Sequence, residues 1–150
     1  MSFYSYGEET AVLRATNCIF RDDGHELFTQ GVGAVDILID YSDFQGGYSG
    51  QGNIDADPCF VDSGYWDNND TTSDSADDFW VDGDYHLQSE AGYWSPVLGD
   101  WIAASVTSPC IDAGDPNGPV GEEPQPNGAR INMGAYGGTI EASKSYLGEL

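Results

Sequence analysis

Basic residues are scarce in this chain of 150 residues, in which 26 acidic side chains stand against four basic ones. The four are Arg14, Arg21, Arg130 and Lys144. Nucleic acid is therefore excluded as a partner, because binding to phosphates needs clustered lysine and arginine. Binding to an anionic membrane surface is excluded for the same reason. The partners that fit this charge are cations, above all calcium, and neutral glycans.

The sequence also lacks a long apolar run. The stretch Val35–Ile39 has the length of a strand and is interrupted by Asp36, so membrane insertion is not expected. The first residues have neither a basic start nor an apolar stretch, and we expect any export signal to lie outside this sequence. Aromatic residues make up 13% of the chain, which predicts a folded protein and argues against an acidic disordered segment.

A repeat occupies the first third of the chain. The segment Ala11–Phe20 aligns with Val35–Phe44 at an offset of 24 residues. Apolar residues alternate with polar ones in both copies, which predicts strands with one inward face. The matched inward pairs are Ala11 with Val35, Leu13 with Ile37, Ala15 with Ile39, Cys18 with Ser42, and Phe20 with Phe44.

Short strands that repeat at a fixed spacing, with turns between them, are typical of the coils of a solenoid. We expect a third short strand at Glu26–Gln30, after a turn at Arg21–Gly24. Two coils of about 24 residues bury little surface, so they are expected to end a longer stack or to pair with another molecule. An antiparallel sandwich with a chance internal similarity is the alternative.

The pattern changes after Gln45. Residues 63–78 are expected to form a polar acidic loop, and short strands are expected within Ile54–Asp62 and at Asp84–Gln88. Trp94 and Trp101 are expected to pack over the open end of the stack. The chain is thus predicted to be a single domain, 1–150, with coils at 1–50, a loop-rich cap at 51–140 and a tail at 141–150 that begins with a helical turn or a fraying end.

Four motifs carry a resemblance to a known family. They are Gly52–Asp62, Gly83–Leu87, Ser108–Pro116 and Asn127–Gly138. In this order they resemble the C-terminal region of secreted bacterial right-handed parallel β-helix proteins of the planctomycete type. The resemblance implies an all-β solenoid end, an extracellular or cell-surface location and further coils before Met1. It implies little about activity.

The resemblance also implies a disulfide. Three cysteines leave one unpaired, and the family pattern makes Cys59 and Cys110 the pair, in a compartment where disulfides persist. Cys18 lies on the inward face and is expected to be a buried free thiol.

Calcium is the cofactor that the acidic segment favours, because its carboxylate and amide oxygens suit a hard cation. No stretch matches the twelve-residue calcium loop, so an ordinary solvated loop is the alternative. The candidate ligands are Asp67, Asn69, Asp70, Asp74, Asp78, Asp82 and Asp84.

No catalytic residue is predicted. Asp36 and Asp40 are too far apart along one strand to act as the paired carboxylates of a glycosidase. Glycan binding is the alternative, with Arg14, Asp36 and Asp40 on the outward face of the strands. Tyr65 and Trp66 would offer flat faces for a sugar.

The sequence therefore predicts a non-catalytic structural module that caps an exported β-helix protein. Its partner would be a second copy, joined end to end or as a dimer, or the missing N-terminal coils. The alternative function is a carbohydrate-binding or polysaccharide-cleaving domain that depends on calcium.

Overall fold

The computed structural model describes residues 2–5, 10–21, 27–31 and 34–145. These residues form ten short strands and no helix, which confirms the all-β class. It follows that the described part of the chain holds no helix with the length and apolarity needed to cross a membrane. A strand was predicted at Glu26–Gln30. Its first residue, Glu26, lies outside the described residues.

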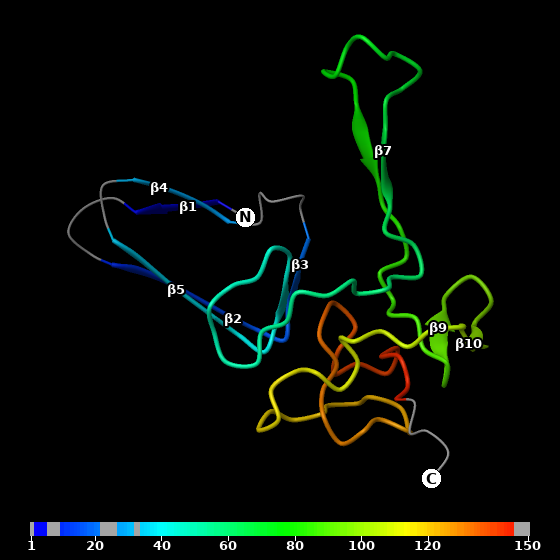
Figure 1. The fold of residues 1–150 in the computed structure, drawn as a ribbon. Coiled ribbons are helices and arrows are strands. Elements are labelled where there is room, and N and C mark those ends of the chain that lie inside the picture. The colour runs from blue at the N-terminus through cyan, green and yellow to red at the C-terminus, as the bar shows by residue number, and fades with distance from the viewer. Residues whose placement is uncertain (1, 6–9, 22–26, 32–33, 146–150) are drawn as a thin grey trace.

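The first six strands form three parallel pairs. The pairs are β1 (Ser2–Ser5) with β4 (Phe28–Gly31), β2 (Ala11–Thr16) with β5 (Val35–Asp40), and β3 (Ile19–Phe20) with β6 (Asp43–Phe44). Figure 1 shows them together in the blue and cyan part of the chain.

The register of these pairs follows the repeat in the sequence. Leu13 lies opposite Ile37, and Phe20 lies opposite Phe44 with the ring centroids 5.3 Å apart. The corner after each strand repeats as well, because Asn17 and Tyr41, which are matched positions, both adopt a left-handed backbone with φ of 59° and 48°. The prediction that residues 24 apart lie side by side in parallel strands is confirmed.

The right-handed parallel β-helix is nevertheless wrong as the fold. Each parallel pair is a separate two-stranded sheet, and no further described strand extends any of them into a stack of coils. The inward side chains of β2 stay only half-buried, because β5 is the only described strand that stacks beside β2. The antiparallel sandwich is not formed either, since the two repeats pair in parallel.

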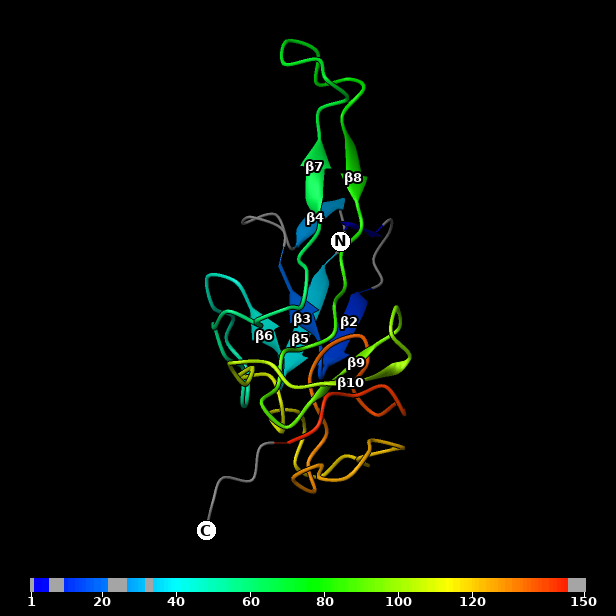
Figure 2. The ribbon, with the colours of Figure 1, turned by 90° about the vertical axis from the view of Figure 1, so that its right-hand side faces the viewer.

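The described strands after β6 pair in antiparallel fashion. Two antiparallel hairpins follow: β7 (Tyr65–Asp67) with β8 (Phe79–Val81), and β9 (Tyr93–Ser95) with β10 (Asp100–Ile102). The first hairpin projects from the body as an arm, which Figures 1 and 2 show from two sides. The prediction of a loop throughout 63–78 missed β7, and Asp84–Gln88 forms a single bridge at Leu87 in place of a strand.

The main core lies among loops, next to the end of the repeats. Leu87, Cys110, Ile111 and Met133 form its buried centre. Ile19 and Phe60 pack against it, together with Ile54 and Ala113, so the end of the parallel region is attached to the C-terminal half. No helical turn forms at Glu141–Ser145, where a turn at Glu141 is followed by irregular backbone.

Buried hydrogen bonds hold the loops in place of strands. The Glu123 carboxylate, 6% exposed, accepts the backbone N–H groups of Asn132 and Gly138 through Oε1, each at 2.8 Å. The Asn132 side chain donates to the carbonyl of Ser143, whose hydroxyl donates to the carbonyl of Leu87. Polar groups in a protein interior need such partners, and here they connect loops that are far apart in sequence.

The cysteines are not paired as expected. All three are free thiols, so the Cys59–Cys110 disulfide implied by the resemblance is not present in the structure. The Cys59 thiol points to the carbonyl of Asp57, whereas the fully buried Cys110 thiol donates to the carboxylate of Asp43. Each sulfur therefore has a separate environment. Cys18 is a free thiol as predicted, and it is half-buried.

The buried carboxylates predict an unusual pH dependence of stability. Burial raises the pKa of Glu123 above its ordinary value of 4.5 and raises that of Asp112 above 3.8. A raised native pKa means that the stabilisation is full at low pH and is lost as pH rises through the native value. We therefore expect the free energy of unfolding to fall as pH rises above the ordinary pKa values of 3.8 and 4.5 of these side chains.

Glu123→Gln should reduce this fall, because the amide keeps the Oε1 acceptor and carries no charge. Glu122→Gln is the matched control, since Glu122 is the exposed neighbour and loses the same charge. The measurement is urea unfolding over a series of pH values from acidic to neutral. An equal change in both variants would show that the overall negative charge, and not the burial of Glu123, causes the effect.

Candidate active or binding cleft

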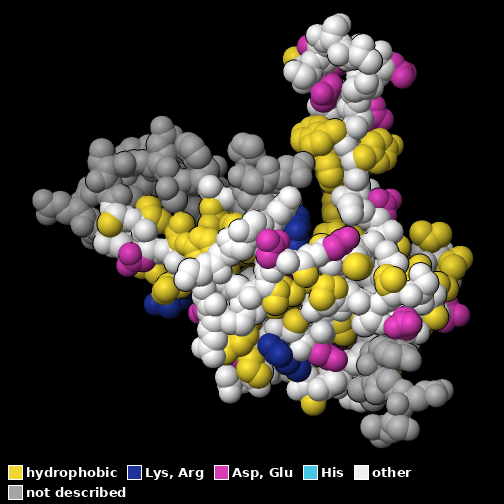
Figure 3. Space-filling model, in the orientation of Figure 1, with side chains coloured by type: hydrophobic (Ala, Val, Ile, Leu, Met, Phe, Trp, Pro, Cys, Tyr) yellow, Lys and Arg dark blue, Asp and Glu magenta, His cyan; other side chains and the backbone are white. Residues whose placement is uncertain are grey.

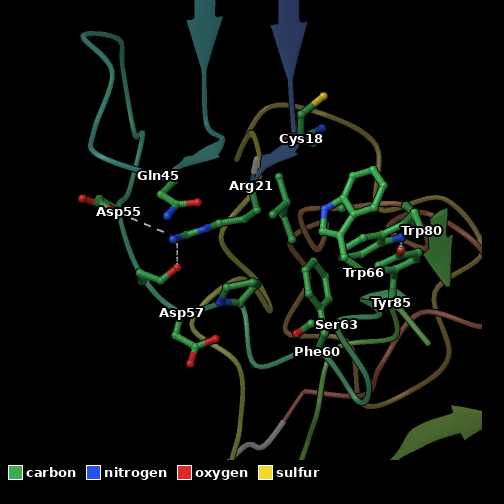
Figure 4. A pocket seen from close by; sticks show the side chains of 16 residues that line it. Cys18, Arg21, Gln45, Asp55, Asp57, Phe60, Ser63, Trp66, Trp80 and Tyr85 are labelled. Atoms are coloured by element: carbon green, nitrogen blue, oxygen red, sulfur yellow. Dashed lines mark hydrogen bonds and ion pairs between the residues drawn. The ribbon is translucent and has the colours of Figure 1, made fainter. Parts of the chain in front are cut away.

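A cleft lies at the base of the arm, between the arm and the end of the parallel region. Its volume is about 1130 Å³, which is large for a ligand pocket in a small domain. Figure 4 shows two unlike walls, with Arg21 and Gln45 on one side and aromatic side chains on the other. The residues that line the cleft include Arg21, Asp55, Asp57, Phe60, Trp66, Trp80 and Tyr85.

The aromatic wall is built from two edge-to-face pairs. Trp66 and Trp80 have ring centroids 5.6 Å apart, and Phe60 and Tyr85 have centroids 5.5 Å apart. The Trp80 indole N–H donates to the Tyr85 hydroxyl at 3.0 Å, which links the two pairs. Trp66 is 67% exposed and Trp80 42% exposed, so broad aromatic faces remain open to a ligand.

The local sequence explains why these rings meet. Trp66 and Trp80 are register partners in the hairpin, so both side chains leave the same face of the two strands. Gly64 precedes β7 with φ of +73°, and a Cβ there would lie 2.7 Å from the Trp80 side chain. The small residue lets Trp80 lie against the backbone at the base of the arm. Figure 3 shows the hydrophobic side chains of the arm below its polar tip, around the middle of the arm.

The polar wall depends on a buried ion pair. The Arg21 guanidinium donates to both oxygens of Asp43, with the closest contact at 2.7 Å, and to the carbonyl of Ala56. Asp43 is completely buried and also accepts the backbone N–H of Ala56 at 3.0 Å. The exposed Asp55 lies 3.8 Å from Arg21 at the rim of the cleft. Arg21 is thus fixed in one orientation along the wall.

The thiols near the cleft do not supply a nucleophile. Burial and the charge of Asp43 raise the pKa of Cys110 to about 12, so this thiol stays protonated at neutral pH. Burial also raises the pKa of Cys18 and of Cys59. A catalytic cysteine needs a lowered pKa, which these sites do not provide.

A second buried titratable group lies outside the cleft. His86 is buried, stacks on Tyr136 at 3.6 Å, and its Nδ1 lies 2.5 Å from Asp84. Its Nε2 is 3.7 Å from the carboxylate of Glu141. This arrangement connects the segment after β8 with the C-terminal segment. It supports the fold, and His86 is not among the residues that line the cleft.

The candidate calcium ligands are not gathered into one site. Among the residues that the structure describes, no group of three or more acidic, histidine or cysteine side chains could hold a metal ion. Asp67 and Asp74 each accept a backbone N–H two residues ahead, as residues in tight turns do. Asp82 accepts the Tyr85 hydroxyl, and Asp84 pairs with His86. The remaining candidates, Asn69, Asp70 and Asp78, lie in the same acidic loop.

The candidate glycan residues separate into two groups. Arg14, Asp36 and Asp40 belong to β2 and β5 and do not line the cleft, and Tyr65 points away from it on the opposite face of β7. Trp66 alone of this set lines it. Within the described ranges, Arg14 forms no ion pair with Asp36 or Asp40.

The sequence interpretation missed Arg21, Asp43 and Trp80. The sequence contained two signals. Arg21 directly follows a repeat strand, and the two tryptophans Trp66 and Trp80 flank a turn-rich segment. Neither signal specified that the segments meet.

Comparison with known proteins adds no assignment, because no protein-family model, no curated protein and no solved structure matches the chain.

Removal of the charge of Asp43 is expected to lower the stability of the fold strongly. Asp43→Asn should lower the free energy of unfolding by about 3 kcal/mol, because it leaves a largely buried guanidinium without its counter-charge. Asp55→Asn, which removes the exposed partner of the same arginine, should cost at most about 1 kcal/mol. Chemical denaturation measures both. Equal losses in the two variants would contradict the view that Asp43 anchors Arg21.

Proposed function

We propose that the protein binds a carbohydrate in the cleft at the base of the arm. The observation that carries the proposal is the pairing of an open aromatic wall with a polar wall across one cavity. A sugar ring has an apolar C–H face and a polar rim of hydroxyl groups. The former packs on an aromatic ring, and the latter bonds to charged and amide side chains.

The geometry supports specific stacking on the tryptophans. Trp66 and Trp80 stand at about 73° to each other, so they offer two differently oriented faces to neighbouring sugar units. Arg21 is held in place before a ligand arrives, so little side-chain entropy is lost on binding. Rigid aromatic and charged groups of this kind are typical of sites that select a ligand by shape.

Binding is favoured over cleavage by the state of the buried acid. A glycosidase needs an acid free to protonate the scissile bond, together with a second carboxylate. The Asp43 carboxylate already accepts bonds from Arg21, Ala56 and Cys110. We therefore place the protein among non-catalytic carbohydrate-binding proteins. An extracellular or cell-surface location, as expected from the sequence, is part of this proposal.

Replacement of Trp66 tests the function. Trp66→Ala should weaken oligosaccharide binding by about tenfold, because it removes the more exposed stacking face. Tyr65→Ala is the matched control, since Tyr65 is exposed on the opposite face of the same strand and does not line the cleft. Calorimetric titration over a panel of oligosaccharides gives the affinities. The titration is repeated with calcium and with a chelator, which tests the predicted cofactor.

No binding to any member of the panel would rule the proposal out. Equal loss in the Tyr65 and Trp66 variants would move the binding surface from the cleft to the arm as a whole.

Self-association is a second candidate function, favoured by the open edge of β2. Among the described strands β2 pairs only with β5, so one edge carries backbone groups without strand partners. Such an edge is a template for pairing with another chain. Val12, on the outward face of this strand, is 54% exposed. The capping role expected of residues 51–140 has no solenoid to close, but association of two copies does not need one.

Sedimentation at increasing concentration tests this association. We expect a dimer to form as concentration rises, and Leu13→Asp should weaken it because a charge enters the half-buried inward face that the two copies would share. Val12→Asp on the outward face of the same strand is the control and should have the smaller effect. Circular dichroism confirms that each variant is folded. A monomer at every concentration would exclude self-association.

A further inference from the structure

The charges that line the cleft are unbalanced. Among the lining residues that the structure describes, Arg21 is the one basic side chain, and the buried Asp43 beside it already offsets that charge. Asp55 and Asp57 also line the cleft, and Asp55 keeps half of its side chain exposed. The wall opposite the tryptophans therefore presents a net negative charge to a ligand.

We infer that the ligand of the cleft is a glycan with protonated amino groups, such as a polymer of glucosamine. This inference rests on the proposed function and specifies its ligand class. An ammonium group on the sugar would pair with the carboxylates of Asp55 and Asp57, because the one positive charge of Arg21 is already shared between Asp43 and Asp55. The hydroxyl groups and C–H faces of the same sugar would use the remaining polar and aromatic surfaces.

The aromatic wall favours the same charge. The face of an indole ring carries negative electrostatic potential, and tryptophan is the strongest of the aromatic side chains in attracting a cation. Trp66 and Trp80 leave wide faces exposed across the cleft from the carboxylates. An amino sugar between the two walls would meet favourable charge on both sides.

Acidic polysaccharides fit poorly. A uronate needs a cationic partner whose charge is not already balanced, and the charge of Arg21 is paired with the buried carboxylate of Asp43. The formal net charge of −22 adds a long-range field that repels a polyanion and attracts a polycation. The field acts through solvent, so it should speed association at low salt and weaken as salt is added.

The test compares glucosamine oligomers that differ only in acetylation. A hexamer of glucosamine, its fully N-acetylated form, a glucose hexamer and a galacturonate hexamer are titrated into the protein by calorimetry. The pH is mildly acidic, where the sugar amine is protonated and aspartate side chains are ordinarily ionised. We expect the glucosamine hexamer to bind about fivefold or more tightly than its acetylated form. The galacturonate hexamer should bind least.

The double variant Asp55→Asn, Asp57→Asn distinguishes the effect of the cleft carboxylates on binding from the effect of the overall charge. Asp57 accepts the N–H of Cys59 at 2.8 Å, and the amide oxygen of an asparagine in its place can accept the same bond, so the turn is retained. Asp70→Asn with Asp74→Asn removes the same charge from the arm, outside the cleft lining. We expect the first variant to lose the preference for the amino sugar and the second to keep it.

Each outcome bears on one of the two proposals. Equal affinity for the glucosamine and acetylated hexamers, with loss in Trp66→Ala, would overturn the inference and leave carbohydrate binding in the cleft intact. Equal weakening by the two double variants would show attraction by net charge alone and would also overturn the inference. Glucosamine binding that Trp66→Ala does not change would overturn the cleft as the site, and with it both proposals.

Discussion

The contact between Arg21 and Asp43 determines how the two halves of the molecule meet. Asp43 lies in β6 and is completely buried, so its charge requires the guanidinium that follows β3. The same carboxylate accepts the N–H of Ala56 and the thiol of Cys110, which belong to segments with no strand pairing between them. The end of the repeats, the chain leading to the arm and the core are therefore held at one carboxylate, and the polar wall of the cleft is the exposed side of that contact.

Local periodicity in the sequence was sufficient for the parallel pairs. Alternation of apolar residues and a fixed offset determine both which face is inward and which residues pair, and β2 and β5 have the predicted register. The same pattern does not determine how many turns stack, because stacking depends on whether further chain covers the inward face. Here the inward side chains of β2 stay half-buried and no further described strand joins the pair, so a correct pairing led to an incorrect solenoid.

The cleft could not be derived in this way, since its residues come from segments without a shared period. Trp66 and Trp80 become neighbours through a hairpin whose strands have three residues each. The long Asp-, Asn- and Ser-rich turn between them obscured these strands, although each tryptophan was visible in the sequence. Arg21 meets Asp55 and Ala56 only after the chain has passed through both repeats. Such contacts follow from tertiary packing, which periodicity and composition do not encode.

The acidic composition and the loop-rich fold are physically related. Carboxylates and amides that would repel each other in a dense core instead accept backbone N–H groups in turns, as Asp67, Asp74 and Asp115 do. Each such bond stabilises a loop without a strand partner, so a chain with many acids can be ordered with few strands. The cost is a strong negative field around the molecule. At the cleft this field coincides with exposed indole faces, and the combination gives a cationic sugar an advantage that neither feature would provide alone.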